Sequence, residues 1–249
     1  RNNLHGKTWY QRPLAIYQAN NFETDPASLH GRDIAEQALR LNASAVIVDA
    51  GGGIATFYPS KVEGLTPVPD MKERDFLREM VEECSSAGLK VFARNDFGHL
   101  AVQTARAHPD WAARSPDGEM IEVYDVARSC PTGPFFLDRS VEAFEEQITE
   151  YGVDGIYING LGGRCHCDRC KARFERETGL KWPEHFDHTD PNFGDWVEWG
   201  YRMVTELTRR QYEGVKRVDP DVPYFIDTAG LQWYERIQSS AQEMGDQAR

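Results

Sequence analysis

The sequence has few cysteines, fewer basic than acidic residues, and no long apolar run. Five cysteines in 249 residues are too sparse for a disulfide-stapled scaffold. No stretch approaches the ~20 consecutive apolar residues of a membrane-spanning helix, so we expect no association with a membrane. Lysine and arginine total 28 against 40 acidic residues, a net charge of -12. Because nucleic acids and anionic membranes require clustered basic residues, we expect neither as a partner, whereas a neutral sugar is compatible with this charge.

Several catalytic motifs are also missing. The glycine-rich stretch Gly160-Leu-Gly-Gly163 lacks the Lys-Ser/Thr ending of a phosphate-binding loop, and GxGxxG is absent. No G-x-S-x-G elbow occurs, which argues against hydrolysis through an activated serine.

The chain starts at Arg1 instead of Met and stops in a polar stretch, so we expect that both ends are cut and that the protein continues beyond Arg249.

Short β-branched runs alternate with amphipathic segments, a pattern typical of parallel α/β proteins. A turn signal, Ser115-Pro-Asp-Gly118, predicts a hairpin over residues 111–124. The five βα units fit the N-terminal part of a (β/α)8 TIM barrel in one domain over residues 1–249, or alternatively an open doubly wound sheet. We expect strands at 13–18, 45–49, 90–96, 153–159 and 223–227, and helices at 31–41, 71–87, 141–151 and 195–218.

Three cysteines lie within six residues, directly after the fourth expected strand. Closely spaced thiolates suit zinc, and four protein ligands would leave no position for water, so the expected cofactor is a structural Zn²⁺. The fourth ligand is expected in the loop Arg128-Ser-Cys-Pro131, with His166 as the alternative ligand and free surface thiols as the alternative to a metal. Such clustered thiols favour a reducing compartment, and we expect a cytoplasmic protein. The expected metal ligands are Cys130, Cys165, Cys167 and Cys170. Cys84 lies on an apolar helix face and is expected to be buried.

The residues around this cluster resemble a known family. The strand Gly152-Val-Asp-Gly-Ile-Tyr-Ile-Asn159 with the cysteine pattern after it, and the segment from Asp70 to Gly88 followed by Val91-Phe-Ala-Arg94, are similar to the hypothetical glycosyl hydrolase domains. These are barrel proteins related to the family 42 β-galactosidases and the α-L-fucosidase-like enzymes. The likeness spans about residues 10–185. It implies a TIM barrel, O-glycosidase activity on terminal galactoside- or fucoside-like sugars, a zinc whose fourth cysteine lies upstream, and a possible homo-oligomer.

Candidate site residues follow from the barrel, because its enzymes place their chemistry at the carboxyl ends of the strands. Glycoside hydrolysis usually needs two carboxylates. The candidates for catalysis are Asp227, Asp96 and Asp49; their structural alternatives are a helix cap, an ion pair and a turn, respectively. The candidates for substrate binding are Asn159, Arg94, Tyr17 and Trp9, with rim packing as the alternative for the aromatic residues.

Asn159 departs from the pattern of the family. Fucosidase-like relatives carry an aspartate nucleophile at the end of the fourth strand, and an amide cannot attack an anomeric carbon. Three hypotheses follow: a glycosidase whose carboxylates come from other strands, a non-catalytic barrel that binds carbohydrate, and a zinc-stabilised module for protein contacts.

Overall fold

The computed structural model describes residues 9–123, 125–160 and 164–227. The structure groups the chain into two compact units, and the single domain over residues 1–249 stays a prediction. Among the described residues, the first unit comprises residues 9–96, 142–159 and 213–226, and the second comprises residues 97–141, 160–212 and Asp227. None of the described helices combines the length and the apolar composition that crossing a membrane requires.

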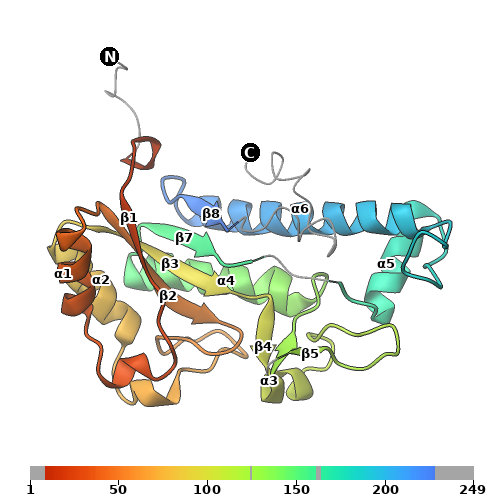
Figure 1. The fold of residues 1–249 in the computed structure, drawn as a ribbon, viewed down its shortest axis with the longest axis horizontal. Helices are drawn as coiled ribbons and strands as arrows, with labels where there is room; N and C mark the ends of the chain where they lie inside the picture. Colours follow the sequence, from red (N-terminus) through yellow and green to blue (C-terminus); the bar gives the residue numbers. More distant parts are fainter. Residues whose placement is uncertain (1–8, 124, 161–163, 228–249) are drawn as a thin grey trace. The chain divides into compact units, whose positions relative to one another are not determined.

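A parallel sheet forms the first unit, and its strands are those that the sequence predicts (Figure 1). They are β1 (Ile16–Ala19), β2 (Ala45–Gly52), β3 (Lys90–Asp96), β7 (Gly155–Ile158) and β8 (Tyr224–Ile226). Each of these five strands pairs in parallel with the next of the five in chain order. A doubly wound sheet would need a reversal of strand order. The order β1-β2-β3-β7-β8 contains none over the described strands, so the doubly wound alternative does not match it.

Helices α1 (Gly31–Arg40) and α2 (Phe76–Ser86) cover one face of this sheet (Figure 1). Side chains of β2 and β3 that point to this face, such as Val46 and Val91, are fully buried. Helix α2 begins later than expected, because residues 69–71 form a separate 3-10 turn, η3 (Pro69–Met71), and the Asp75 carboxylate caps the helix by accepting the Arg78 N–H. Cys84 is fully buried as predicted, and burial raises the pKa of its thiol to about 12.

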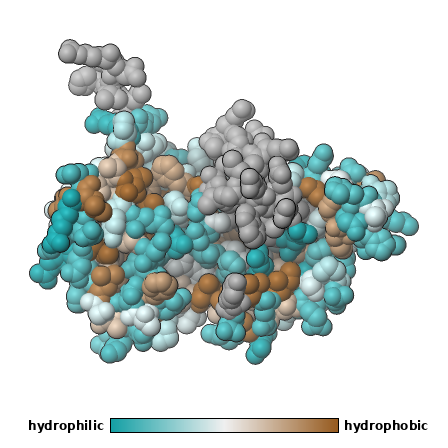
Figure 2. All heavy atoms as spheres, viewed as in Figure 1, coloured by the Kyte–Doolittle hydropathy of each residue, from teal (hydrophilic) through white to brown (hydrophobic). Residues whose placement is uncertain are grey.

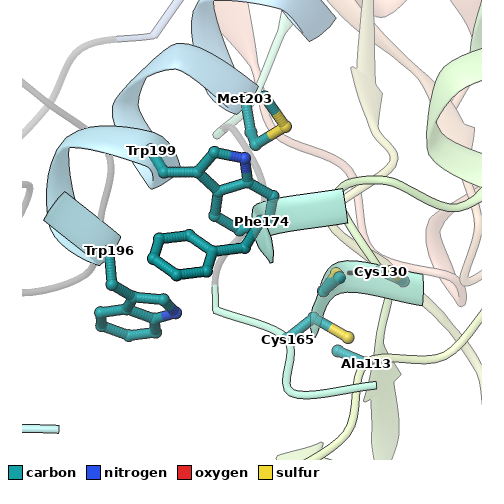
Figure 3. Close-up of a cluster of buried hydrophobic side chains, with 8 residues drawn as sticks. Ala113, Cys130, Cys165, Phe174, Trp196, Trp199 and Met203 are labelled. Carbon is teal, nitrogen blue, oxygen red and sulfur yellow. Dashed lines mark hydrogen bonds between the residues drawn. The ribbon is translucent and has the colours of Figure 1, made fainter. Parts of the chain in front are cut away.

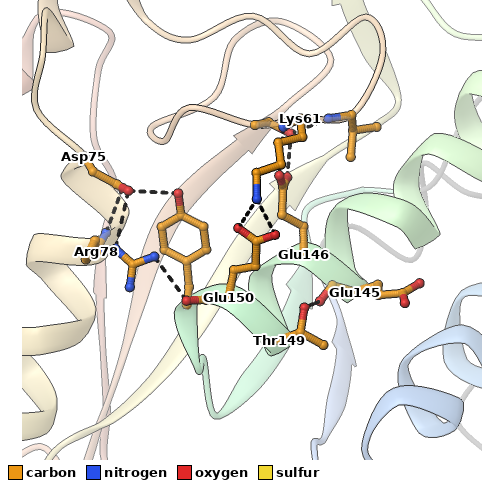
Figure 4. Close-up of polar contacts among 10 residues, drawn as sticks. Lys61, Asp75, Arg78, Glu145, Glu146, Thr149 and Glu150 are labelled. Carbon is orange, nitrogen blue, oxygen red and sulfur yellow. Dashed lines mark hydrogen bonds and ion pairs between the residues drawn. The ribbon is translucent and has the colours of Figure 1, made fainter.

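A third helical segment runs from Phe135 to Tyr151 and is π-helical at both ends: η4 (Phe135–Arg139), α4 (Ser140–Glu146) and η5 (Gln147–Tyr151). Its last turns fasten a long loop and the start of α2, as Figure 4 shows. Glu146 accepts hydrogen bonds from the Ser60 hydroxyl at 2.6 Å and the Lys61 N–H at 2.7 Å. The Tyr151 hydroxyl donates to Asp75 at 2.9 Å. These contacts hold the connection between β2 and α2 against the helix.

In its described residues, the second unit contains an antiparallel sheet of order β4-β6-β5, three α-helices and the start of the helical segment from Phe135. The elements are β4 (His99–Ala101), α3 (Val102–Ala107), β5 (Glu122–Val123), β6 (Val126–Arg128), α5 (Asp168–Thr178) and α6 (Phe193–Val218). The last turns of α6, from Glu213, belong to the first unit. The hairpin predicted over residues 111–124 includes an antiparallel bridge between Arg114 and Met120. Figure 3 shows the core, in which Phe174, Trp196 and Trp199 are almost fully buried. Trp196 is therefore a core residue.

Candidate functional site

A pocket of about 210 Å³ lies at the carboxyl ends of β2 and β3 in the first unit. This edge of a parallel sheet is where ligands bind in open and closed α/β folds. The pocket brings together Asp49, Arg94 and Asp96, three of the residues that the sequence singles out. Asn21 and Glu23 were missed; they follow β1, where only their position just beyond a strand end could have marked them. The lining residues are Asn21, Glu23, Asp49, Gly51, Gly52, Ile54, Ala55, Phe57, Arg94 and Asp96.

Asp49 and Arg94 form an ion pair across neighbouring strands. The two residues are partners in the β2–β3 register, so their side chains leave the sheet on the same face. The Arg94 Nη1 donates to Asp49 Oδ1, while Asp49 Oδ2 accepts the Asn21 N–H at 2.6 Å. Asp49 is only 4% exposed. Burial raises the pKa of its carboxyl group, and the bonds from Asn21 and Arg94 act in the opposite direction.

Glycines shape the loop that follows β2. Gly51 and Gly52 have φ angles of 106° and 150°, a region that side chains disfavour. A Cβ on Gly52 would lie 1.9 Å from the carbonyl oxygen of Asp96. The Gly53 N–H donates to this same carbonyl at 3.0 Å. The glycines therefore let the loop close directly onto the backbone of Asp96, beside the pocket.

We expect Gly52→Ala to unfold at lower urea concentration than Gly88→Ala. Gly88 also has a positive φ, of 79°, but a Cβ there meets nothing within 4 Å. Gly88→Ala should therefore show backbone strain alone, about 1 kcal/mol, whereas Gly52→Ala adds displacement of the Asp96 backbone and should cost roughly 3 kcal/mol or more. Equal losses of unfolding free energy in the two variants would show that the close approach of Gly52 to the Asp96 backbone does not affect stability.

Asp96 and Asn159 are neighbours at the same edge of the sheet. The Asn159 side-chain amide lies 3.4 Å from Asp96 Oδ2, and the Asn159 N–H donates to the Asn95 carbonyl at 2.8 Å. Both residues are half-buried. The Asn159 amide is thus placed against a pocket carboxylate, where it can donate a hydrogen bond but cannot act as a nucleophile.

The other candidates from the sequence do not line the pocket. Tyr17 is in register with Val46, so it points to the face of the sheet opposite Asp49. Trp9 packs on Phe92 with ring centroids 5.5 Å apart, and the Lys90 ammonium at the first residue of β3 lies 5.5 Å from the Trp9 ring. Trp9 is therefore near the amino ends of the strands, the edge opposite the pocket. Asp227, half-buried, directly follows β8 in the chain and is counted with the second unit.

The four predicted cysteines of the second unit converge. Their sulfur atoms all lie within 4.8 Å of one another. The Cys130 sulfur is 3.8 Å from that of Cys167 and 3.6 Å from that of Cys170. A tetrahedron with metal–sulfur bonds of about 2.3 Å has edges of about 3.8 Å. The spacing of the thiols thus fits a tetrahedral metal of the size of zinc.

The electrostatics of this cluster also fit a cation. Hydrogen bonding from the Cys130 thiol lowers the pKa of Cys167, whereas the same neighbour raises the pKa of Cys165 and of Cys170. The pKa of Cys130 is lowered as well, so two of the four thiols ionise more readily than a free cysteine and two less readily. A divalent cation removes this conflict, because it allows all four thiols to ionise at once.

His166, the alternative ligand, turns away from the sulfurs. Its ring packs in an aromatic cluster, with the Phe186 ring centroid 4.2 Å away and the Trp182 and Trp196 rings beyond it. The ring is buried, and this burial together with the charge of Arg164 lowers the pKa of His166 to about 4. A neutral imidazole in an apolar cluster anchors the cysteine loop instead of completing the metal site.

Comparison with solved structures reveals the same fold in glycosidases. An α-L-fucosidase from Paenibacillus thiaminolyticus superposes with a TM-score of 0.68 at 21% identity, over 86% of this chain and 32% of that one. A β-galactosidase from Rahnella sp. R3 gives 0.61 at 17% identity, over 86% and 35%. A β-galactosidase from Bacillus circulans sp. alkalophilus gives 0.57 at 14%, over 85% and 35%. The chain thus spans about a third of the length of these enzymes.

Sequence comparison gives the family. No curated protein matches the chain. The family model described as "Hypothetical glycosyl hydrolase 6" matches residues 30–160, more than half of the sequence. This range contains Asp49, Arg94, Asp96 and Asn159, all at the carboxyl edge of the parallel sheet. The chain belongs to the hypothetical glycosyl hydrolase 6 family.

Proposed function

We propose that the chain is part of a glycoside hydrolase whose sugar binds in the pocket at the carboxyl ends of β2 and β3. The observation that carries this proposal is the position of Glu23, Asp49 and Asp96 around one small pocket at the sheet edge where α/β enzymes act. The family match over residues 30–160 supports it, and so does the fucosidase and galactosidase fold. The proposed substrate is a terminal galactoside- or fucoside-like sugar, because the two similar enzymes are an α-L-fucosidase and a β-galactosidase.

The parallel sheet is proposed to be the first five strands of a (β/α)8 barrel. Strands β1 and β8 each pair with one neighbour among the described strands, and the strand order follows the chain. The face of the sheet away from α1 and α2 exposes Ile16 and Phe225, at 43% and 39%. Apolar side chains are visible at the surface beside β1 (Figure 2). Further strands would pair with both edges and enclose this face.

The pocket residues divide into two roles. Each carboxylate oxygen of Asp49 already accepts a hydrogen bond, one from Arg94 and one from Asn21. We therefore assign Asp49 as the residue that positions Arg94, whose guanidinium lines the pocket and suits a sugar hydroxyl. Asp96 is proposed as a catalytic carboxylate. Glu23, which lines the same pocket, is the candidate for the second.

The cysteine cluster is proposed to bind a structural zinc. Cys130, Cys165, Cys167 and Cys170 would hold it, and a Zn²⁺ with four thiolates has no position left for water or substrate. Zinc would therefore supply cross-linking and not catalysis: it ties the loop at Cys130 to the N-terminus of α5. Cys170 lies in that helix, and Cys167 is its N-cap residue.

The test is hydrolysis of a panel of aryl glycosides, with Asp96→Asn and Asp70→Asn as matched variants. Asp70 is an exposed aspartate of the same unit that does not line the pocket. Asp96→Asn should lower kcat by about 10²- to 10⁴-fold with sugar binding retained, because it removes an acid or base and not the pocket. Asp70→Asn should leave kcat unchanged. Glu23→Gln, assayed in the same way, tests the second carboxylate, and full activity of Asp96→Asn would refute the assignment.

A non-catalytic carbohydrate-binding barrel is the second candidate, because Asn159 stands where the family's relatives carry a nucleophile. Its amide and the Arg94 guanidinium are donors suited to sugar hydroxyls. This alternative predicts that aryl glycosides are bound but not turned over, and that Arg94→Met weakens binding. The third hypothesis, a module for protein contacts, predicts no sugar binding at all.

A further inference from the structure

The cysteine cluster has to accommodate a large negative charge once a metal is bound. Four thiolates and one Zn²⁺ carry a net charge of -2. Cys130, Cys165 and Cys170 are buried, and only Cys167 is half-buried. A buried charge of this size is costly unless hydrogen-bond donors or nearby cations spread it. Donors that point at the sulfur atoms are therefore part of the site.

Two such donors come from residues that are not ligands. The Arg114 N–H donates to the Cys165 sulfur at 3.4 Å. The Thr132 hydroxyl oxygen lies 3.1 Å from the Cys170 sulfur and 3.4 Å from that of Cys130. Thr132 is only 5% exposed, so its hydroxyl has little access to water. Only proline would remove the main-chain donor, and it would also restrict the backbone, whereas the hydroxyl can be removed without changing the backbone.

The turn that carries Cys130 holds this hydroxyl in place. The Gly133 N–H donates to the Cys130 carbonyl at 2.9 Å, which closes a tight turn around Pro131 and Thr132. A Cβ on Gly133 would come within 3.2 Å of the Cys130 Cβ and of the Arg169 guanidinium, so the turn is closely packed on both sides. Thr132 therefore sits between one sulfur of its own loop and one of α5.

We propose, resting on the zinc site proposed above, that Thr132 is a determinant of metal retention and of thiolate reactivity. A metal-bound thiolate can only accept a hydrogen bond, so the hydroxyl must donate its proton, and the shorter distance assigns it to Cys170. This bond withdraws electron density from the sulfur. Cys170 thus becomes a weaker nucleophile towards oxidants and alkylating agents, and the net charge of the site is better tolerated.

The test compares Thr132→Val and Thr132→Ser with Thr208→Val in the zinc-loaded full chain. Valine keeps the shape of threonine without the donor, and serine keeps the donor. Thr208 is the matched control, a buried threonine of the same unit whose hydroxyl donates to the Val204 carbonyl at 2.9 Å, within α6. Thr132→Val should weaken zinc binding about 10- to 100-fold in competition with a chromogenic chelator, and hydrogen peroxide should release its zinc faster. Thr132→Ser and Thr208→Val should match the parent chain.

A second readout is the cobalt-substituted protein. Loss of the hydrogen bond should shift the sulfur-to-cobalt charge-transfer bands of Thr132→Val, and Thr132→Ser should restore them. Unchanged bands and unchanged chelator competition in Thr132→Val, with one zinc still bound, would overturn this inference and leave the metal site standing. A parent chain that binds neither zinc nor cobalt would overturn both.

Discussion

Replacement of Cys170 by serine is expected to abolish stoichiometric zinc binding and to lower the melting temperature by roughly 10 °C or more. Structural zinc sites contribute apparent binding free energies of about 10–16 kcal/mol, and folding depends on them. A serine hydroxyl is a poor substitute for a thiolate ligand. Loss of about 4 kcal/mol is enough for the predicted shift in a chain of this size. The measurements are metal analysis of the purified protein and thermal unfolding followed by circular dichroism.

Cys84→Ala provides the matched control for this variant. Cys84 is a buried thiol of the first unit, outside the cluster, so its replacement removes a sulfur without removing a ligand. The control should keep one zinc per chain and lose only the packing of one small side chain. A chelator should destabilise the parent chain and Cys84→Ala alike but leave Cys170→Ser unaffected. One zinc per chain in Cys170→Ser would contradict the four-cysteine assignment.

The sequence was sufficient to predict the parallel sheet, because buried strands are marked by local composition. Residues 45–49 and 90–96 are apolar runs that end in polar residues, and both form strands, β2 and β3, at those positions. Helix α5 and the small antiparallel sheet were not predicted. The stretch Asp168–Thr178 is highly charged and has few apolar residues to mark a face. Strands of two or three residues, such as β5 and β6, carry too little pattern to detect.

The candidate site was predictable only in part, for a different reason. The strand ends single out Asp49, Arg94 and Asp96, and all three line one pocket because parallel strands end at one edge of the sheet. The ion pair was not predictable. Asp96 lies only two positions after Arg94 in the sequence, yet Arg94 forms its ion pair with Asp49 on the neighbouring strand. Loop residues such as Glu23 line the pocket because of the loop's conformation, which hydrophobic periodicity in the sequence does not predict.

Arg94→Met is expected to destabilise the chain more than Asp49→Asn does. Removing Arg94 leaves a carboxylate that is 4% exposed without its counter-ion, which typically costs about 3–5 kcal/mol. Removing the charge of Asp49 leaves a guanidinium whose side chain is 23% exposed and can recruit water. The asparagine also still accepts the Asn21 N–H. Urea unfolding at neutral pH measures the difference, and Glu36→Gln and Arg40→Met, which break an exposed pair on α1, should each cost about 0.5 kcal/mol or less.

The pH dependence of Arg94→Met provides a further check. Burial already raises the pKa of Asp49 in the folded chain, and Arg94 is one of the groups that lower it. Without Arg94 the folded-state pKa of Asp49 rises further above its unfolded value. The loss of unfolding free energy in Arg94→Met is therefore full at high pH and shrinks as pH falls through the raised pKa. The double variant Asp49→Asn/Arg94→Met removes both charges and should cost clearly less than the sum of the two single changes. Additive costs, with no pH dependence in Arg94→Met, would mean that the pair does not hold Arg94 in the pocket, and Arg94 would then lose its assigned role as a sugar ligand positioned by Asp49.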